Sequence, residues 1–236
     1  MKDLRHFNIT PFSSISDTLL YIKQSYTTQG AYHIITANPE IVYEAVINKD
    51  YNNIFKQVEL VVADGIGVAL PLSWKGAESQ RIPGIELFEA LLHDEQLGGN
   101  GVYLVGAKAD VVAKSANNLI DKGVNVCGYR DGFFSLELET IQDIAIEIKK
   151  HKPSIIAVAM GAPRQDIVIS LLRKEGVNAI FIGVGGAFDV LSGNLKRAPI
   201  LIQKLKIEWL YRLLGDLRRL PRYKKIFNYF VWLFKE

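Results

Sequence analysis

Polar side chains follow several apolar, β-branched segments of this chain, at the points where buried strands would end. A carboxylate there could act as a base, amides and hydroxyls could bind a sugar or a nucleotide, and glycine N–H groups could bind phosphate. The candidates are Thr36, Asn38, Asp64, Gln165 and Asp166, with Gly183, Gly185 and Gly186. Because the carboxyl ends of parallel strands meet at one edge of a sheet, we expect these residues to share one crevice.

Asp64 is the strongest catalytic candidate. It follows the apolar segment 60–63 and precedes Gly65, which suits a tight turn. A carboxylate held in a partly desolvated cleft is suited to general-base chemistry. The same residue would also suit the cap of a helix that begins near Ile66. The spacing leaves both interpretations open.

The other candidates also have structural alternatives. Thr36 and Asn38 would bind a sugar or a nucleotide, or form a turn cap before Pro39. The turn at 183–186 would bind phosphate, or its glycines would allow a helix to pack closely on the sheet. Arg81, in a loop before a predicted helix, would contact a diphosphate or lie solvated at the surface.

Patterns for other chemistries are missing from the sequence. No two Asp residues are separated by one position, and the four histidines lack metal-ligand spacing. The sequence contains no Walker motif, no complete G-x-G-x-x-G and no arrangement typical of a Ser/His/Asp or Cys/His site. We therefore expect neither a metal nor a cofactor.

Strand-like and helix-like segments alternate along the body of the chain. Predicted strands are Tyr32–Thr36, Leu60–Ala63, Val102–Val105, Val124–Tyr129, Ile155–Met160 and Ala179–Val184. Predicted helices are Pro39–Asn48, Ile66–Ser73, Ile85–His93, Asp110–Asp121, Leu136–Lys150 and Arg164–Lys174. The strands are nearly continuous apolar runs, which is typical of parallel strands covered on both faces. The sequence predicts an α/β fold with an open, mostly parallel, Rossmann-like sheet.

The last 41 residues differ from the rest in charge and aromatic content. Residues 196–236 contain eleven Lys or Arg and three acids, whereas residues 1–195 contain 17 basic and 22 acidic residues. Two of the three tryptophans, Trp209 and Trp232, lie here, beside the aromatic run 226–234. This pattern favours contact with an anionic membrane surface rather than with nucleic acid, and the alternative is a terminal helix docked on the core.

The overall composition and the change in charge near residue 196 together give the predicted domain organisation. With 49% hydrophobic and 22% charged residues, the chain is typical of a globular protein. We predict a catalytic domain over residues 1–195 and a helical, basic, membrane-directed appendage over residues 196–236. One cysteine, no signal peptide and no apolar stretch of about 20 residues indicate a cytoplasmic protein, peripheral on the inner face of the membrane. The oligomeric state, a homo-oligomer included, is left open.

Seven ordered motifs resemble those of the WecG/TagA/CpsF glycosyltransferases, glycosyltransferase family 26. They are Thr36-Ala37-Asn38-Pro39-Glu40, Ala63-Asp64-Gly65, Arg81-Ile82-Pro83-Gly84, Met160 to Asp166, Gly183 to Asp189, Lys196-Arg197-Ala198-Pro199 and Glu208-Trp209-Leu210-Tyr211-Arg212. The resemblance extends from about Asn8 to Tyr223. It implies an inverting transferase that moves a sugar from a UDP-sugar donor to a polyprenyl-diphosphate-linked acceptor, without a metal.

The resemblance is closest in type to the TagA branch. That branch transfers N-acetylmannosamine from UDP-N-acetylmannosamine to undecaprenyl-diphosphate-N-acetylglucosamine, the step that begins the linkage unit of wall teichoic acid. UDP-glucose and UDP-N-acetylmannosaminuronic acid remain alternative donors within the family.

The resemblance also implies a role for individual residues. It makes Asp64 the base and places Thr36, Asn38 and Gln165 in the sugar or nucleotide pocket. Three tail arginines would reach the acceptor diphosphate: Arg212, Arg219 and Arg222. The sequence departs from the family pattern at Asp166, where Glu is usual, and at Asp216-Leu217, where Glu-Pro is usual.

Two other functions are compatible with an α/β sheet. A nucleotide-dependent oxidoreductase would place G-x-G-x-x-G after its first strand, where this chain has Thr36-Ala37-Asn38-Pro39. A non-enzymatic, membrane-binding scaffold would need neither Asp64 nor the glycine turn.

Overall fold

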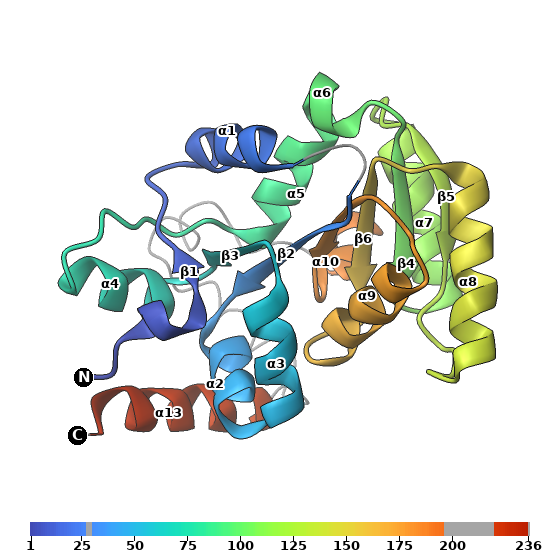
Figure 1. The fold of residues 1–236 in the computed structure, drawn as a ribbon. Coiled ribbons are helices and arrows are strands. Elements are labelled where there is room, and N and C mark those ends of the chain that lie inside the picture. The colour runs from blue at the N-terminus through green and yellow to red at the C-terminus, as the bar shows by residue number, and fades with distance from the viewer. Residues whose placement is uncertain (27–29, 196–219, 236) are drawn as a thin grey trace.

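A parallel β-sheet of seven strands forms the centre of the computed structural model, which describes residues 1–26, 30–195 and 220–235 (Figure 1). The strand order is β1-β3-β2-β7-β6-β4-β5. The strands are β1 (Ile9–Thr10), β2 (Tyr32–Ala37), β3 (Leu60–Ala63), β4 (Val102–Gly106), β5 (Val126–Arg130), β6 (Ile155–Ala159) and β7 (Ile180–Gly183). The predicted parallel, Rossmann-like α/β sheet is confirmed, and the short edge strand β1 is an addition to it.

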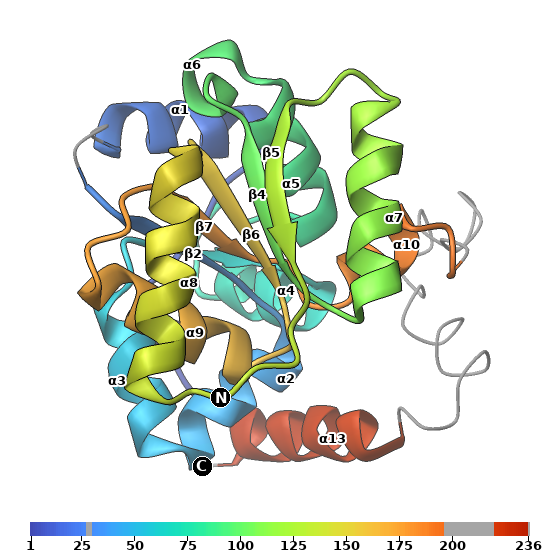
Figure 2. The same cartoon turned by 90° about the vertical axis from the view of Figure 1, so that its right-hand side faces the viewer.

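Helices cover both faces of this sheet (Figures 1 and 2). They are a 3₁₀ turn η1 (Leu4–Phe7) and the α-helices α1 (Ile15–Ser25), α2 (Pro39–Ile47), α3 (Lys49–Gln57), α4 (Ile66–Trp74), α5 (Gly84–His93), α6 (Glu95–Gly98), α7 (Ala109–Ile120), α8 (Leu138–His151), α9 (Arg164–Lys174), α10 (Ala187–Leu191) and α13 (Leu220–Phe234). All six helices predicted for the body are present, with ends within about two residues of the expected positions.

Alternate strand residues pack into different core clusters. On β2, Ile34 packs with α1, α5, α7 and α10, whereas its neighbour Ile35 packs with α2, α3 and α4. On β4, Leu104 joins the first of these clusters and Val105 joins a third cluster beneath α8 and α9. This alternation follows from the twofold side-chain period of a strand. The two faces of the sheet are therefore packed against different sets of helices, and these hold the strands whose carboxyl ends form the edge.

Helix α13 packs against the body, chiefly against α2 (Figures 1 and 2). Tyr229 and Leu233 are fully buried in the cluster that also contains α2, α3 and α4. The Lys225 Nζ atom lies 2.8 Å from the Glu44 carboxylate. This face of α13 is therefore docked on the core, which is the second of the two interpretations of the tail.

The aromatic run 226–234 is divided between two environments. The sequence predicts that the whole run lies in the headgroup layer, but its buried face belongs to the protein core. Phe227, Val231 and Phe234 are more than half exposed on the other face. No helix in the described part of the chain is both long and apolar enough to cross a bilayer. The membrane-directed role and the division at residue 195 stay predictions.

Candidate active site

A cleft of about 1100 Å³ lies at the carboxyl edge of the sheet. It is lined by the ends of β2, β3, β4, β6 and β7 and by the loop after β5. Of the predicted site residues it contains Thr36, Asn38, Asp64, Gln165, Gly183, Gly185 and Gly186. A smaller hollow of about 260 Å³ lies near Gly101, before β4, and contains none of them. The large cleft therefore contains most of the residues that the sequence singles out as candidates for catalysis and binding.

Asp64 is oriented by the loop and helix that follow α4. One carboxylate oxygen lies 3.5 Å from Arg81 Nε. The other lies 3.3 Å from the backbone nitrogen of Gly84, the first residue of α5. The N-cap of α4 is Gly65, with no side-chain hydrogen bond, so the alternative that Asp64 caps α4 is wrong. About a quarter of the Asp64 side chain is exposed. The carboxylate is thus both held in place and open to a ligand.

Arg81 lies behind Asp64 rather than along the cleft. It is not among the residues that line the cavity, and its guanidinium contacts the Asp64 carboxylate. This position makes Arg81 a residue that orients Asp64, and direct contact with a diphosphate stays a prediction.

Thr36 and Asn38 end β2 and begin α2. Asn38 is the N-cap of α2, and its Oδ1 atom accepts from the backbone N–H of Ile41. The side-chain oxygen of Asn38 therefore acts as a cap, as the structural alternative predicts. The residue also lines the cleft. The Thr36 hydroxyl lies 3.3 Å from the carbonyl of Gly183, so it links the ends of β2 and β7. A Cβ at Gly84 would lie 2.9 Å from this hydroxyl, and only glycine allows α5 to approach so closely.

Gln165 holds the glycine turn that follows β7. Its Oε1 atom accepts from the N–H of Gly185 at 3.1 Å, and its side chain is almost fully buried. A Cβ at Gly183 would lie 2.3 Å from Gln165 Nε2. Both interpretations of the turn therefore have support: its glycines allow close packing, and its backbone lines the cleft.

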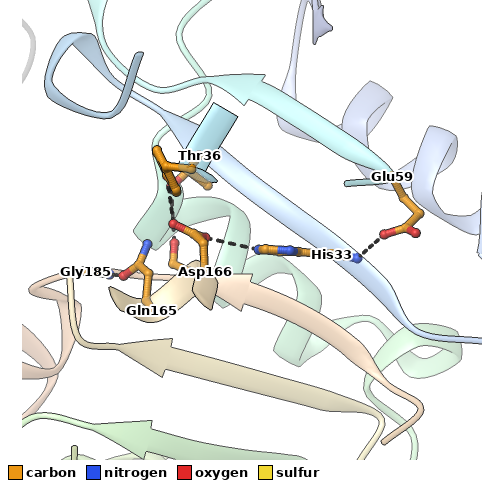
Figure 3. Close-up of polar contacts among 8 residues, drawn as sticks. His33, Thr36, Glu59, Gln165, Asp166 and Gly185 are labelled. Atoms are coloured by element: carbon orange, nitrogen blue, oxygen red, sulfur yellow. Dashed lines mark hydrogen bonds and ion pairs between the residues drawn. The ribbon is translucent and has the colours of Figure 1, made fainter. Parts of the chain in front are cut away.

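Asp166 is not among the residues that line the cleft, and its carboxylate points toward His33 (Figure 3). Its side chain is fully buried, accepts a hydrogen bond from Tyr51 Oη at 2.8 Å and is hydrogen-bonded to His33 Nε2 at 3.1 Å. Adjacent residues of a helix point about 100° apart, so Gln165 faces the cleft while Asp166 faces the sheet. Both described side-chain contacts of Asp166 are internal, and its expected contact with substrate stays a prediction.

The partners of Asp166 are themselves buried. Burial, followed by the Asp166 charge, raises the pKa of Tyr51, which keeps its hydroxyl protonated as a donor. The Nδ1 atom of His33 has no partner among the described residues. The network joins β2, α3 and α9 directly under Gln165.

The loop after β5 also lines the cleft, although none of the sequence motifs pointed to it. Phe133 lines the cleft and is 77% exposed, and the Phe134 ring lies between the guanidinium groups of Arg130 and Arg164, 5.8 Å from each. Lys108 lines the same cleft from the end of β4. The rule that ligands bind beyond the carboxyl ends of parallel strands would have pointed to this loop, because it follows a predicted strand.

The tail arginines are the remaining predicted site residues. Arg212, Arg219 and the side chain of Arg222 lie outside the described residues. Their contact with the acceptor diphosphate stays a prediction.

A comparison with protein families decides the class of the chain. The model of the glycosyl transferase WecG/TagA/CpsF family matches residues 5–236, nearly the whole length. The chain belongs to this family. As a WecG/TagA/CpsF family glycosyltransferase it acts on a sugar donor and an acceptor, and the cleft at the carboxyl edge is the candidate site for both.

Proposed function

We propose that the protein is an inverting glycosyltransferase that moves N-acetylmannosamine from UDP-N-acetylmannosamine to undecaprenyl-diphosphate-linked N-acetylglucosamine. One observation supports this most strongly: the oriented carboxylate of Asp64 lines the same cleft as the glycine turn after β7. An inverting transfer needs a base on one side of the sugar and a site for the departing diphosphate on the other. The cleft offers both.

The nucleotide half of the cleft would lie between the loops after β4, β5, β6 and β7. Lys108 and Arg164 supply cations there, and Gly185 and Gly186 supply a backbone turn. The exposed Phe133 ring offers an apolar face against which a base could stack. Such cations and dipoles would stabilise the negative charge that develops on UDP as the glycosidic bond breaks.

In this mechanism Asp64 receives the proton of the acceptor hydroxyl. The acceptor oxygen attacks the anomeric carbon from the face opposite UDP, so the configuration inverts and UDP leaves with the bonding electrons. Gly84 N–H and Arg81 hold the carboxylate in the orientation that this proton transfer requires. General-base catalysis of this kind contributes roughly 10²–10⁴-fold to a rate.

A donor screen tests the substrate assignment. We expect UDP-N-acetylmannosamine to give the fastest transfer to a short-chain lipid-diphosphate-N-acetylglucosamine acceptor, with released UDP and glycosylated acceptor as readouts. Activity should persist in excess EDTA, because Lys108 and Arg164 serve the leaving group in place of a metal. Faster transfer from UDP-glucose or UDP-N-acetylmannosaminuronic acid would change the donor, and rescue by Mg²⁺ after chelation would contradict the metal-free mechanism.

The exposed face of α13 favours a membrane surface as the place of the reaction, at the cytoplasmic side. A polyprenyl acceptor stays in the bilayer, so the enzyme must come to it. Phe227 and Phe234 are 67% and 53% exposed on α13, and Trp74 is 61% exposed on α4. The exposed Lys224 and Lys235 flank this apolar face along the same helix. Aromatic rings beside lysines suit the boundary between headgroups and acyl chains.

Substitution of the exposed aromatic residues tests this contact. The double variant Phe227→Ser, Phe234→Ser should float with phosphatidylglycerol-containing vesicles roughly tenfold less well, because two rings no longer enter the interface. Its melting temperature should be nearly unchanged, since neither side chain is buried. Leu20→Ser on α1, 57% exposed in the wild type, is the matched control and should bind normally. Equal flotation of both variants would refute membrane docking through α13.

A further inference from the structure

Helix α4 contains a proline in its interior. Pro71 has no backbone N–H, so the carbonyl of Gly67, four residues earlier, lacks the donor that an α-helix normally provides. The hydroxyl of Tyr229, on α13, lies 2.8 Å from this carbonyl oxygen. Because a carbonyl can only accept, Tyr229 is the donor. Burial raises the pKa of Tyr229, so the hydroxyl keeps its proton.

The surroundings of Gly67 are shaped to receive α13. A Cβ at Gly67 would lie 2.8 Å from Pro39 Cγ and 3.1 Å from the Phe230 ring, so a side chain there would push α2 or α13 away. The backbone N–H of Lys2 donates to the carbonyl of Leu233 at 2.7 Å, near the end of the same helix. The contact between α4 and α13 is therefore specific, and it involves backbone groups as well as apolar area.

The proposed base lies immediately before α4, whose N-cap is Gly65. Asp64 lies three residues before Gly67, and the carbonyl of Gly65 between them accepts from the N–H groups of Val68 and Ala69. Asp64 N–H donates to the carbonyl of Ala37, which fixes its other side to β2. A displacement of the first turn of α4 would therefore move the Asp64 backbone relative to the cleft.

We propose that Tyr229 is a positioning residue for Asp64: it supplies the hydrogen bond that Pro71 removes from α4, and so couples the seating of the C-terminal helix to the orientation of the base. The inference rests on the proposed function only in taking Asp64 as the base. The C-terminal segment then has a part in turnover that is separate from membrane contact, because Tyr229 is fully buried in the protein.

The hydrogen bond itself is tested by thermal unfolding. Tyr229→Phe keeps the ring and should lower the melting temperature by about 2–6 °C. In a Pro71→Ala background the helix regains its own N–H donor, and there Tyr229→Phe should have little further effect. Tyr43→Phe, which removes a hydroxyl from a half-buried tyrosine of the same core cluster, is the matched control. If Tyr229→Phe lowered the melting temperature equally with and without the Pro71→Ala substitution, the donor replacement would be overturned.

The positioning role is tested by kinetics of the full-length chain with a short-chain, water-soluble acceptor. Tyr229→Phe should lower kcat about tenfold, leave KM for the UDP-sugar within about twofold and leave vesicle binding unchanged. In an Asp64→Asn background it should have no further effect on turnover, because the base that it positions is absent. A wild-type kcat, or the same fold loss in both backgrounds, would overturn the inference. If Asp64→Asn alone kept full turnover, the base assignment would fail together with it.

Discussion

Replacement of Asp64 with asparagine will lower the turnover of glycosyl transfer by roughly 10²–10⁴-fold while the protein stays folded. Asparagine keeps the shape of the side chain and its contact with the Gly84 N–H, but it cannot receive the proton of the acceptor hydroxyl. The loss should appear in kcat, since the amide still fits the cleft. Single-turnover transfer to a short-chain acceptor, with melting temperature and UDP binding measured in parallel, checks this result.

Asp143→Asn provides the control for that change. Asp143 is an exposed carboxylate of α8, away from the cleft, so the same chemical substitution there should leave kcat unaltered. A folded Asp64→Asn protein whose turnover matches that of Asp143→Asn would remove Asp64 from the mechanism. The base would then have to be sought among the other acidic residues of the cleft, Glu40, Asp110 and Asp189.

Replacement of Asp166 with alanine will chiefly destabilise the fold. The substitution removes the hydrogen-bond partner of two buried polar atoms, Tyr51 Oη and His33 Nε2, and each buried polar group left unsatisfied costs about 1–3 kcal/mol. We expect the free energy of unfolding to fall by about 2–5 kcal/mol, which lowers the melting temperature by roughly 4–20 °C in a chain of this size. UDP binding should weaken as well, because Gln165 stands on the same helix turn.

The control for Asp166 is again on α8. Asp143→Ala removes an exposed carboxylate and should leave the melting temperature within about 2 °C of wild type. Asp166→Asn should lie between Asp166→Ala and wild type, because one side-chain oxygen remains to accept. A wild-type melting temperature for Asp166→Ala would show that the buried network contributes nothing to stability.

The sequence by itself determined the sheet and the edge on which the site lies. Apolar runs such as 102–105 and 155–160 report burial on both faces directly, and the helices between them require parallel strands. The rule that ligands lie beyond the carboxyl ends then places Asp64, Gln165 and the glycine turn together. Local patterns missed β1, whose two residues are too few to show a period, and the helices α1, α3, α6 and α10, of which α3 follows α2 directly after Asn48.

Only the tertiary structure decided which face each side chain takes. Gln165 and Asp166 are adjacent in the sequence and both polar, yet one lines the cleft and the other binds Tyr51, 115 positions earlier in the chain. The aromatic run of α13 is uniform in composition, yet one face of it is buried and the other is exposed, because α2 covers one side of the helix. The bond from Tyr229 to Gly67 spans 162 positions. A sequence pattern reports what a residue can do with its near neighbours, whereas these contacts depend on how distant elements pack, and packing is settled only when the whole chain folds.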